Sequence, residues 1–118
     1  WRKLLEAGAV IANGSDFPVE SPNPFYGLHA AITRQDHNNE PPGGWFPEER
    51  MSREEAFASF TIDAAFAGHQ ESILGTLEAG KKADFILIDQ DIFTIPESAI
   101  WQTGVLETWV GGQQIYSR

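Results

Sequence analysis

The first hydrophobic and polar positions of the chain follow the order of a helix and then a strand. Residues 1–8 place Leu4 and Leu5 among charged neighbours and end on Gly8, which is typical of the last turn of a helix. Residues 9–13 form a short apolar run without alternation, a pattern that favours a strand buried on both faces. A helix, a glycine and a buried strand in this order indicate an α/β fold.

A second helix is predicted over residues 24–34, followed by a long loop. Apolar residues recur there at helical spacing, Pro24 suits the first turn, and Asn23 can cap it. Residues 35–50 are polar and rich in proline and glycine, which predicts a loop. This loop has two open interpretations, because it can line a substrate mouth or pack outside the main body of the protein.

A third helix begins at a capping-box pattern. Ser52 can cap the helix while Glu55 reaches back to the Ser52 backbone. Apolar residues then continue at helical spacing, so we expect this helix to run to Phe66, with Gly68 as its stop.

The last third of the chain changes from helical to β-rich patterning. Residues 75–82 are turn-rich, and residues 84–89 predict a strand. Two further β-rich runs, residues 105–110 and 113–116, flank Gly111–Gly112. Such a pair predicts an antiparallel hairpin, because glycines tolerate the positive φ of a tight primed turn.

The charge of the chain narrows the classes of partner. Its 118 residues include 8 Lys and Arg and 17 Asp and Glu, which gives a formal net charge of −9. We therefore expect no nucleic-acid partner and no anionic membrane surface as a partner. The absence of cysteine excludes disulfides, thiolate metal sites and cysteine nucleophiles, but it leaves the compartment open.

Both predicted sheets are too small to be buried by this chain alone. One parallel-type strand has no partner here, and three antiparallel strands are marginal by themselves. The chain also begins at Trp1, and its single Met is Met51. We therefore expect a piece of a longer polypeptide, whose exposed strand edges and apolar faces would make the isolated chain self-associate or form a homo-oligomer.

Asp16 is the strongest candidate for chemistry, because it directly follows the predicted strand. Reactive groups in α/β barrels and parallel sheets lie at the carboxyl ends of strands. A carboxylate there can bind a cation such as Zn²⁺ or take a proton from an attacking water. The alternative is that Asp16 closes the turn through a side-chain hydrogen bond. Taken alone, the tripeptide Gly-Ser-Asp favours this alternative.

The other candidate residues have simpler interpretations. The spacings of His29, His37 and His69 fit no zinc motif. His29 is expected to be a packed or partly exposed helix residue, and the other two are expected to be solvated. Ser15 is read as a turn residue, and Arg34 suits the C-terminal end of its helix, with an anion anchor as the less favoured role. The spacing of Gly75–Lys81 is wrong for a phosphate loop, so a turn is predicted.

Four motifs in this order resemble the amidohydrolase superfamily, in particular its amidohydrolase 3 branch with N-substituted formamide deformylase-like enzymes. The first is Gly14-Ser15-Asp16-Phe17-Pro18-Val19, and the second is Met51-Ser52-Arg53-Glu54-Glu55-Ala56 with Thr61-x-x-Ala64-Ala65. The third is the passage from Gly75 to Asp89, and the fourth is the closing Val110-Gly111-Gly112-Gln113-Gln114-Ile115-Tyr116. Together they span nearly the whole chain.

This resemblance implies the C-terminal piece of a (β/α)₈ barrel joined to a small composite β-sandwich. Residues 1–74 would supply the last barrel strand and helices, and residues 75–118 the C-terminal sandwich strands. Asp16 would then be the metal ligand and proton shuttle for a divalent ion, with zinc expected and its nuclearity open. The other ligands would lie outside this chain.

The function that the resemblance implies is hydrolysis of an amide-type C–N bond in a small-molecule substrate. The chain alone would be inactive and would need the rest of its parent polypeptide. The alternative is a non-catalytic regulatory or binding module that retains the fold. A His-x-His motif upstream of Trp1 would favour the enzyme.

Overall fold

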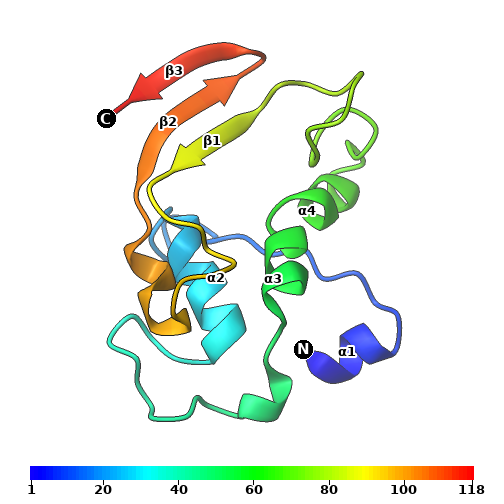
Figure 1. The fold of residues 1–118 in the computed structure, drawn as a ribbon. Coiled ribbons are helices and arrows are strands. Elements are labelled where there is room, and N and C mark those ends of the chain that lie inside the picture. The colour runs from blue at the N-terminus through cyan, green and yellow to red at the C-terminus, as the bar shows by residue number, and fades with distance from the viewer.

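The computed structural model describes residues 1–118 as a group of short helices with a three-stranded sheet at one end (Figure 1). The helices and strands, in chain order, are α1 (Arg2–Glu6), α2 (Pro24–Thr33), η1 (Pro47–Glu49), α3 (Arg53–Ser59), α4 (Ile62–Ala67), β1 (Phe85–Ile88), η2 (Glu97–Gln102), β2 (Val105–Val110) and β3 (Gln113–Ser117). No helix is both long enough and apolar enough to cross a bilayer.

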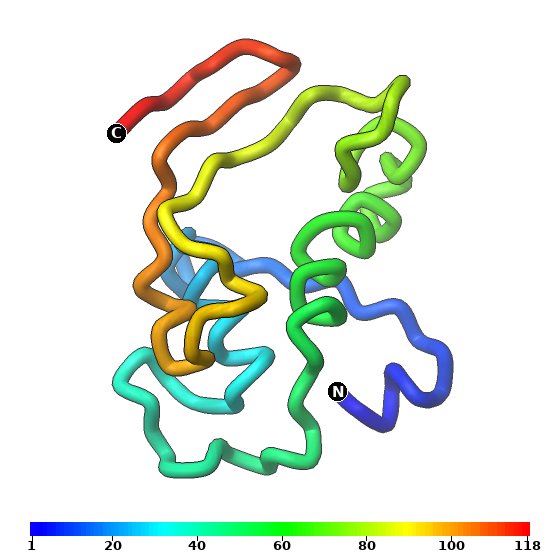
Figure 2. The backbone as a smooth tube through the Cα atoms, in the orientation of Figure 1, coloured from blue at the N-terminus to red at the C-terminus, as the bar shows by residue number.

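The core of the molecule forms where α2 meets α3 and η2. Phe25, Leu28 and Ile32 of α2 are buried there, and Ala56 of α3 and Ile100 of η2 have no exposed surface. Figure 2 shows that these three segments come together although they are far apart in the chain. Burial of their apolar side chains is therefore the main stabilising contribution in this part of the fold.

Helix α2 confirms the helix predicted over residues 24–34, which ends one residue earlier. The Asn23 side chain accepts a hydrogen bond from the Phe25 N–H at 3.0 Å, and Pro24 occupies the first turn. Arg34 closes the helix in the left-handed conformation, with φ of 59°. The local signals were sufficient here because every capping contact is made within a few residues.

The predicted helix from residue 53 to Phe66 is correct at its start and wrong in its middle. Both hydrogen bonds of the Ser52–Glu55 capping box form, but α3 ends at Ser59 and α4 begins at Ile62. The Thr61 hydroxyl donates to the Phe57 carbonyl at 2.8 Å, whereas the Thr61 N–H turns to Ala58. A side-chain bond thus takes the place of the helical backbone bond and interrupts the helix.

The predicted strand over residues 9–13 does not form. This stretch is irregular, and Val10 is largely exposed. It is held instead by Asn13, whose backbone N–H and side-chain amide donate to the Ser59 carbonyl and hydroxyl at 2.9 and 2.8 Å. A parallel strand needs a neighbouring strand to pair its backbone groups, and this chain supplies none beside it.

The β-rich end confirms the predicted antiparallel hairpin and its neighbouring strand. The sheet order is β1-β2-β3, and Val110 pairs with Gln113 across the turn. Gly111 and Gly112 adopt φ of 58° and 77°, as a tight primed turn requires. The Phe85 and Trp109 rings stack across β1 and β2 with centroids 5.6 Å apart. The strand predicted over residues 84–89 is β1, which is slightly shorter.

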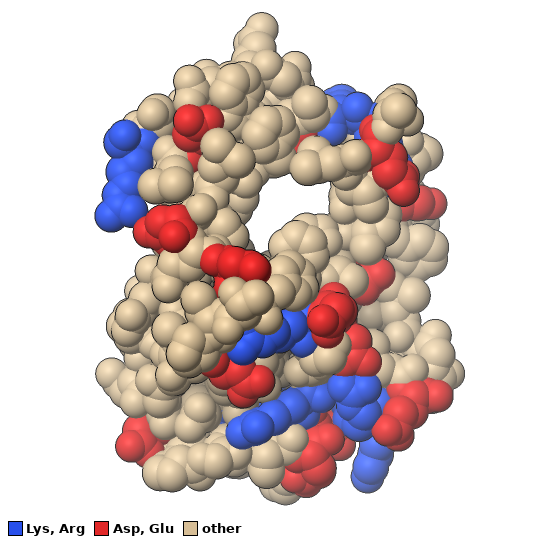
Figure 3. Space-filling model, in the orientation of Figure 1, with Lys and Arg blue, Asp and Glu red and all other residues tan.

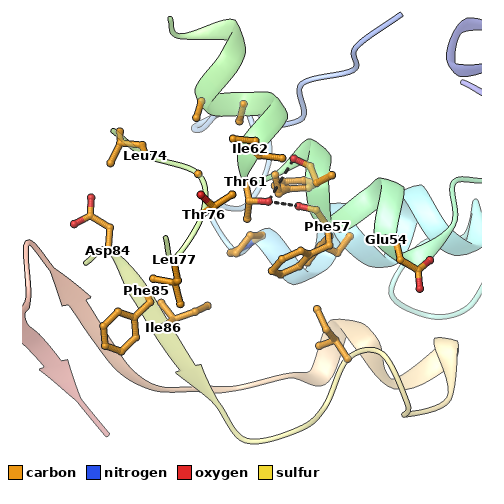
Figure 4. A pocket seen from close by; sticks show the side chains of 18 of the residues that line it. Glu54, Phe57, Thr61, Ile62, Leu74, Thr76, Leu77, Asp84, Phe85 and Ile86 are labelled. Carbon is orange, nitrogen blue, oxygen red and sulfur yellow. Dashed lines mark hydrogen bonds between the residues drawn. The ribbon is translucent and has the colours of Figure 1, made fainter. Parts of the chain in front are cut away.

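An open apolar cavity of about 1030 Å³ lies between the sheet and helices α3 and α4. Figure 3 shows the opening, and Figure 4 shows side chains reaching into it from both sides, among them Phe57, Ile62, Leu77 and Ile86. Leu77 is 71% exposed. This chain therefore leaves a large apolar surface uncovered.

Arg2 joins α1 to α3 through a two-point ion pair with Glu55. The guanidinium donates to the carboxylate at 2.8 and 2.5 Å. Arg2 and the Ser52 N–H together lower the pKa of Glu55 to about 2. The same carboxylate thus serves both the capping box and the attachment of α1.

Glu55→Gln is expected to destabilise the chain by about 1 kcal/mol near neutral pH, since a half-exposed ion pair contributes little more. The folded pKa of about 2 lies below the ordinary 4.5. The stabilisation is therefore complete above the ordinary pKa and is lost as the pH falls through the folded one. Urea unfolding across this range should show that the difference in free energy of unfolding between Glu55→Gln and wild type decreases as the pH falls. A difference that stays constant, or an equal effect of the exposed Glu54→Gln, would contradict the ion pair as its cause.

We propose that the isolated chain self-associates through its uncovered apolar surface and its two outer strands. Light scattering should give a mass above that of one chain. Leu77→Glu should lower that mass, whereas Ser72→Glu, at an exposed polar position nearby, should not. A compact monomer over a wide concentration range would refute the proposal.

Candidate functional site

Asp16 lies in a tight turn that follows the Asn13 attachment to α3. The Val19 N–H donates to the Asp16 carbonyl at 2.8 Å, and Asp16 itself has a left-handed φ of 51°. Aspartate is one of the few residues other than glycine that adopt this conformation readily. The turn therefore depends on Asp16 for its backbone conformation.

The Asp16 side chain is exposed, and its carboxylate accepts no hydrogen bond from this chain. The side-chain bond that the turn-closing alternative requires is thus not observed. Ser15 is half-buried in the same turn, as expected of a turn residue. The carboxylate of Asp16 is free to act on something outside the chain.

A polar cleft of about 470 Å³ opens beside this turn. It is lined by residues on both sides of Asp16 in the chain, by one face of α2 and by the start of the 35–50 loop; these are Gly14, Ser15, Glu20, Ser21, Asn23, Tyr26, Gly27, Ala30, Gln35, Asp36, His37 and Phe60. Of the 35–50 loop, only residues 35–37 line this cleft.

The first part of that loop is fixed by its own polar side chains. Asp36 accepts hydrogen bonds from the Asn38 and Glu40 N–H groups at 2.7 and 3.1 Å. These backbone donors, that of Glu40 first, lower the pKa of Asp36, so the group stays ionised. Gln35 donates to the Asn39 carbonyl at 2.7 Å.

The three histidines have different environments. His29 is 1% exposed, and its Nε2 donates to the Asn39 side-chain carbonyl at 3.1 Å. Burial lowers the pKa of His29, which keeps the ring neutral. His37 is exposed and stacks on Tyr26 with ring centroids 5.1 Å apart, and His69 is exposed after α4. The packing predicted for His29 and the exposure predicted for the others are confirmed.

The other candidate residues have structural roles. The Arg34 guanidinium lies 5.1 Å from the Trp45 ring centroid and donates to the Trp45 carbonyl, so it is no free anion anchor. Lys81 sits in a turn, where its ammonium contacts the Leu74 carbonyl. No group of three or more His, Asp or Glu side chains in the chain could hold a metal ion. Asp16 would therefore contribute a single ligand.

Sequence reasoning missed the cleft, and with it Glu20, Tyr26 and the partnership of Tyr26 with His37. Tyr26 did not stand out as a candidate because it lies within a helical pattern, and His37 did not because it lies in a polar loop. No local signal could have paired these two residues, because Tyr26 belongs to α2 and His37 to the following loop, and only the fold brings their rings to 5.1 Å.

A model of the amidohydrolase family matches residues 1–116. The chain belongs to the amidohydrolase family. The N-substituted formamide deformylase of Arthrobacter pascens is 30% identical over 117 residues, which cover 99% of this chain and 21% of that protein. Protein LONG AFTER FAR-RED 3 of Arabidopsis thaliana is 37% identical over 123 residues, covering 98% of this chain and 19% of that protein.

The fold agrees with this membership. An amidohydrolase from Thermotoga maritima MSB8 superimposes with a TM-score of 0.73 at 21% identity, over 99% of this chain and 25% of that chain. This amidohydrolase chain thus spans about a fifth of the length of the curated relatives named above. Its mixture of helices and a three-stranded antiparallel sheet corresponds to part of an amidohydrolase fold.

His29→Gln is expected to flatten the pH dependence of stability in mildly acidic solution. Because burial lowers the pKa of folded His29 below 6.5, the unfolded chain takes up the proton first as the pH falls. Wild-type stability is then complete above the ordinary pKa and is lost as the pH falls toward the folded one. Urea unfolding at pH ~7.5 and ~5.5 measures this loss. The exposed His69→Gln should keep it, and its persistence in His29→Gln would contradict the assignment.

Proposed function

We propose that this chain is the C-terminal part of a metal-dependent amidohydrolase that hydrolyses an amide-type C–N bond. Residues 1–74 would complete a (β/α)₈ barrel, and residues 75–118 would complete a small β-sandwich. The observation that carries the proposal is the family match over residues 1–116, because it includes the turn that presents Asp16.

The state of Asp16 supports an active role. Most turn aspartates bond to nearby backbone N–H groups. The Asp16 carboxylate accepts no such bond and is exposed. An ionised carboxylate with free lone pairs can bind a cation or accept a proton.

Of the residues in this chain, Asp16 would serve as one ligand of a divalent metal ion. Carboxylate oxygens suit zinc and similar ions, but a catalytic zinc site has three protein ligands. Asp16 would supply one of them, and the rest of the parent polypeptide the others. When bound, such an ion supplies Lewis-acid polarisation and lowers the pKa of a water.

The role of Asp16 in the reaction is the transfer of one proton. Its carboxylate accepts the proton of the attacking water as the new C–O bond forms at the carbonyl carbon. The resulting carboxylic acid then gives that proton to the amide nitrogen as the C–N bond breaks. The products are a carboxylic acid and an amine, and Asp16 returns to its ionised form.

Asp16→Ala in the full-length polypeptide is expected to lower kcat by at least ~10²-fold, since general acid–base help alone contributes ~10²–10⁴-fold. Asp16→Asn should be nearly as damaging, because an amide keeps the shape but takes no proton. Thermal melts of Asp16→Asn should change little, because the side chain is exposed and asparagine also adopts the left-handed φ of 51°. Asp16→Ala should lower stability by about 1–2 kcal/mol, because alanine tolerates this conformation less well, and so the loss of activity is judged on Asp16→Asn.

The assay would follow release of amine from N-formyl and N-acyl amides with zinc present, alongside metal analysis. Glu48→Ala, an exposed carboxylate outside the cleft, is the matched control and should keep full activity. Wild-type rates and metal content in Asp16→Ala would refute the proposed role. The isolated 118-residue chain should hydrolyse none of these amides with added zinc.

A further inference from the structure

The cleft next to the Asp16 turn has the size of a pocket for part of a substrate. Ser15 and Glu20, which line it, flank the Asp16 turn in the chain. A volume of about 470 Å³ is within the range of small-molecule sites. On the proposed function, the group attached to the scissile bond would lie in this cleft.

The charges on the cleft wall are of one sign. Glu20 and Asp36 line the cleft, and no Lys or Arg does. Asp36 is held ionised by the Asn38 and Glu40 N–H groups, which fix its position as well. Arg34, which precedes the lining residue Gln35 in the chain, is engaged with the Trp45 ring and carbonyl. A carboxylate on the substrate would therefore be repelled, and an ammonium attracted.

One wall of the cleft also offers an aromatic surface. Tyr26 stacks on His37 at 5.1 Å, with an angle of 24° between the rings. Both rings belong to the cleft lining, and Phe60 lines it as well. Aromatic faces bind cationic groups favourably, and the attraction adds to that of nearby carboxylates.

The loop segment that carries His37 is attached to α2 through the buried His29. His29 bonds to Asn39, and Gln35 fixes the Asn39 carbonyl. These bonds fix the loop segment that carries Asp36 and His37 relative to α2. The charge and the aromatic face are therefore properties of a fixed wall, which is what selection between similar ligands requires.

We propose that this cleft binds the amine side of the substrate and selects amides whose amine part carries a positive charge over those that carry a carboxylate. This proposal rests on the proposed function for the identity of the reacting bond. Glu20 and Asp36 are the specificity-determining carboxylates, and Tyr26 with His37 forms the surface against which the cation lies.

The test compares three amides of similar length on the full-length protein: N-formylputrescine, N-formylpentylamine and N-formyl-γ-aminobutyrate. We expect kcat/KM to fall in that order, by about tenfold from the cation to the anion. Glu20→Lys should remove or reverse the preference, because it replaces an attractive charge with a repulsive one. Glu48→Lys makes the same charge change outside the cleft and should leave the preference intact.

Calorimetric titration of the same compounds into Asp16→Ala separates binding from turnover. Hydrolysis of all three amides at equal kcat/KM, or an equal effect of Glu48→Lys, would overturn the charge selection and leave the proposed function standing. Binding that favours the cation, without hydrolysis of any amide by the wild-type protein, would overturn the proposed function and support the charge selection.

Discussion

The burial of α2 between α3 and η2 is the contact on which the rest of the structure depends. Ala56 and Ile100 are fully buried against Phe25 and its neighbours, and few other side chains in the molecule are so enclosed. Because only 12 of 118 residues are buried, this small core must fix the relative positions of the segments around it. The 35–50 loop follows α2, the Asp16 turn precedes it, and η2 lies in the chain between β1 and β2 of the sheet.

The core helices position the segments that form the candidate site. Asn13 bonds to Ser59 at the end of α3, so the chain enters the Asp16 turn from a fixed point. On the other side of the cleft, His29 bonds to Asn39 and orders the loop. These two polar contacts attach the segments on either side of the cleft to α3 and α2. Asp16 lies in the turn between Ser15 and Glu20, which line the cleft, and its exposed carboxylate makes no hydrogen bond within the chain.

The large cavity is lined mostly by hydrophobic residues and the cleft mostly by polar ones, and Phe60 lines both. Gly27 permits this arrangement, because a Cβ there would come within 2.5 Å of the Phe60 ring. The ring therefore packs directly on the α2 backbone and separates the polar face from the apolar one. Family membership and the share of its relatives that this chain spans agree with an apolar face that other segments would cover.

The sequence by itself determined the features that are settled within a few residues. Asn23, the Ser52–Glu55 box and Gly111–Gly112 formed the predicted caps and turn, because their partners are local. The four motifs also sufficed to indicate the family. Tertiary structure decided the rest. Residues 9–13 form no strand, because no neighbouring strand pairs with them. Tyr26 and His37, which both line the cleft, are brought together by the fold. Contacts between distant segments depend on how the core brings them together, and no local pattern records that.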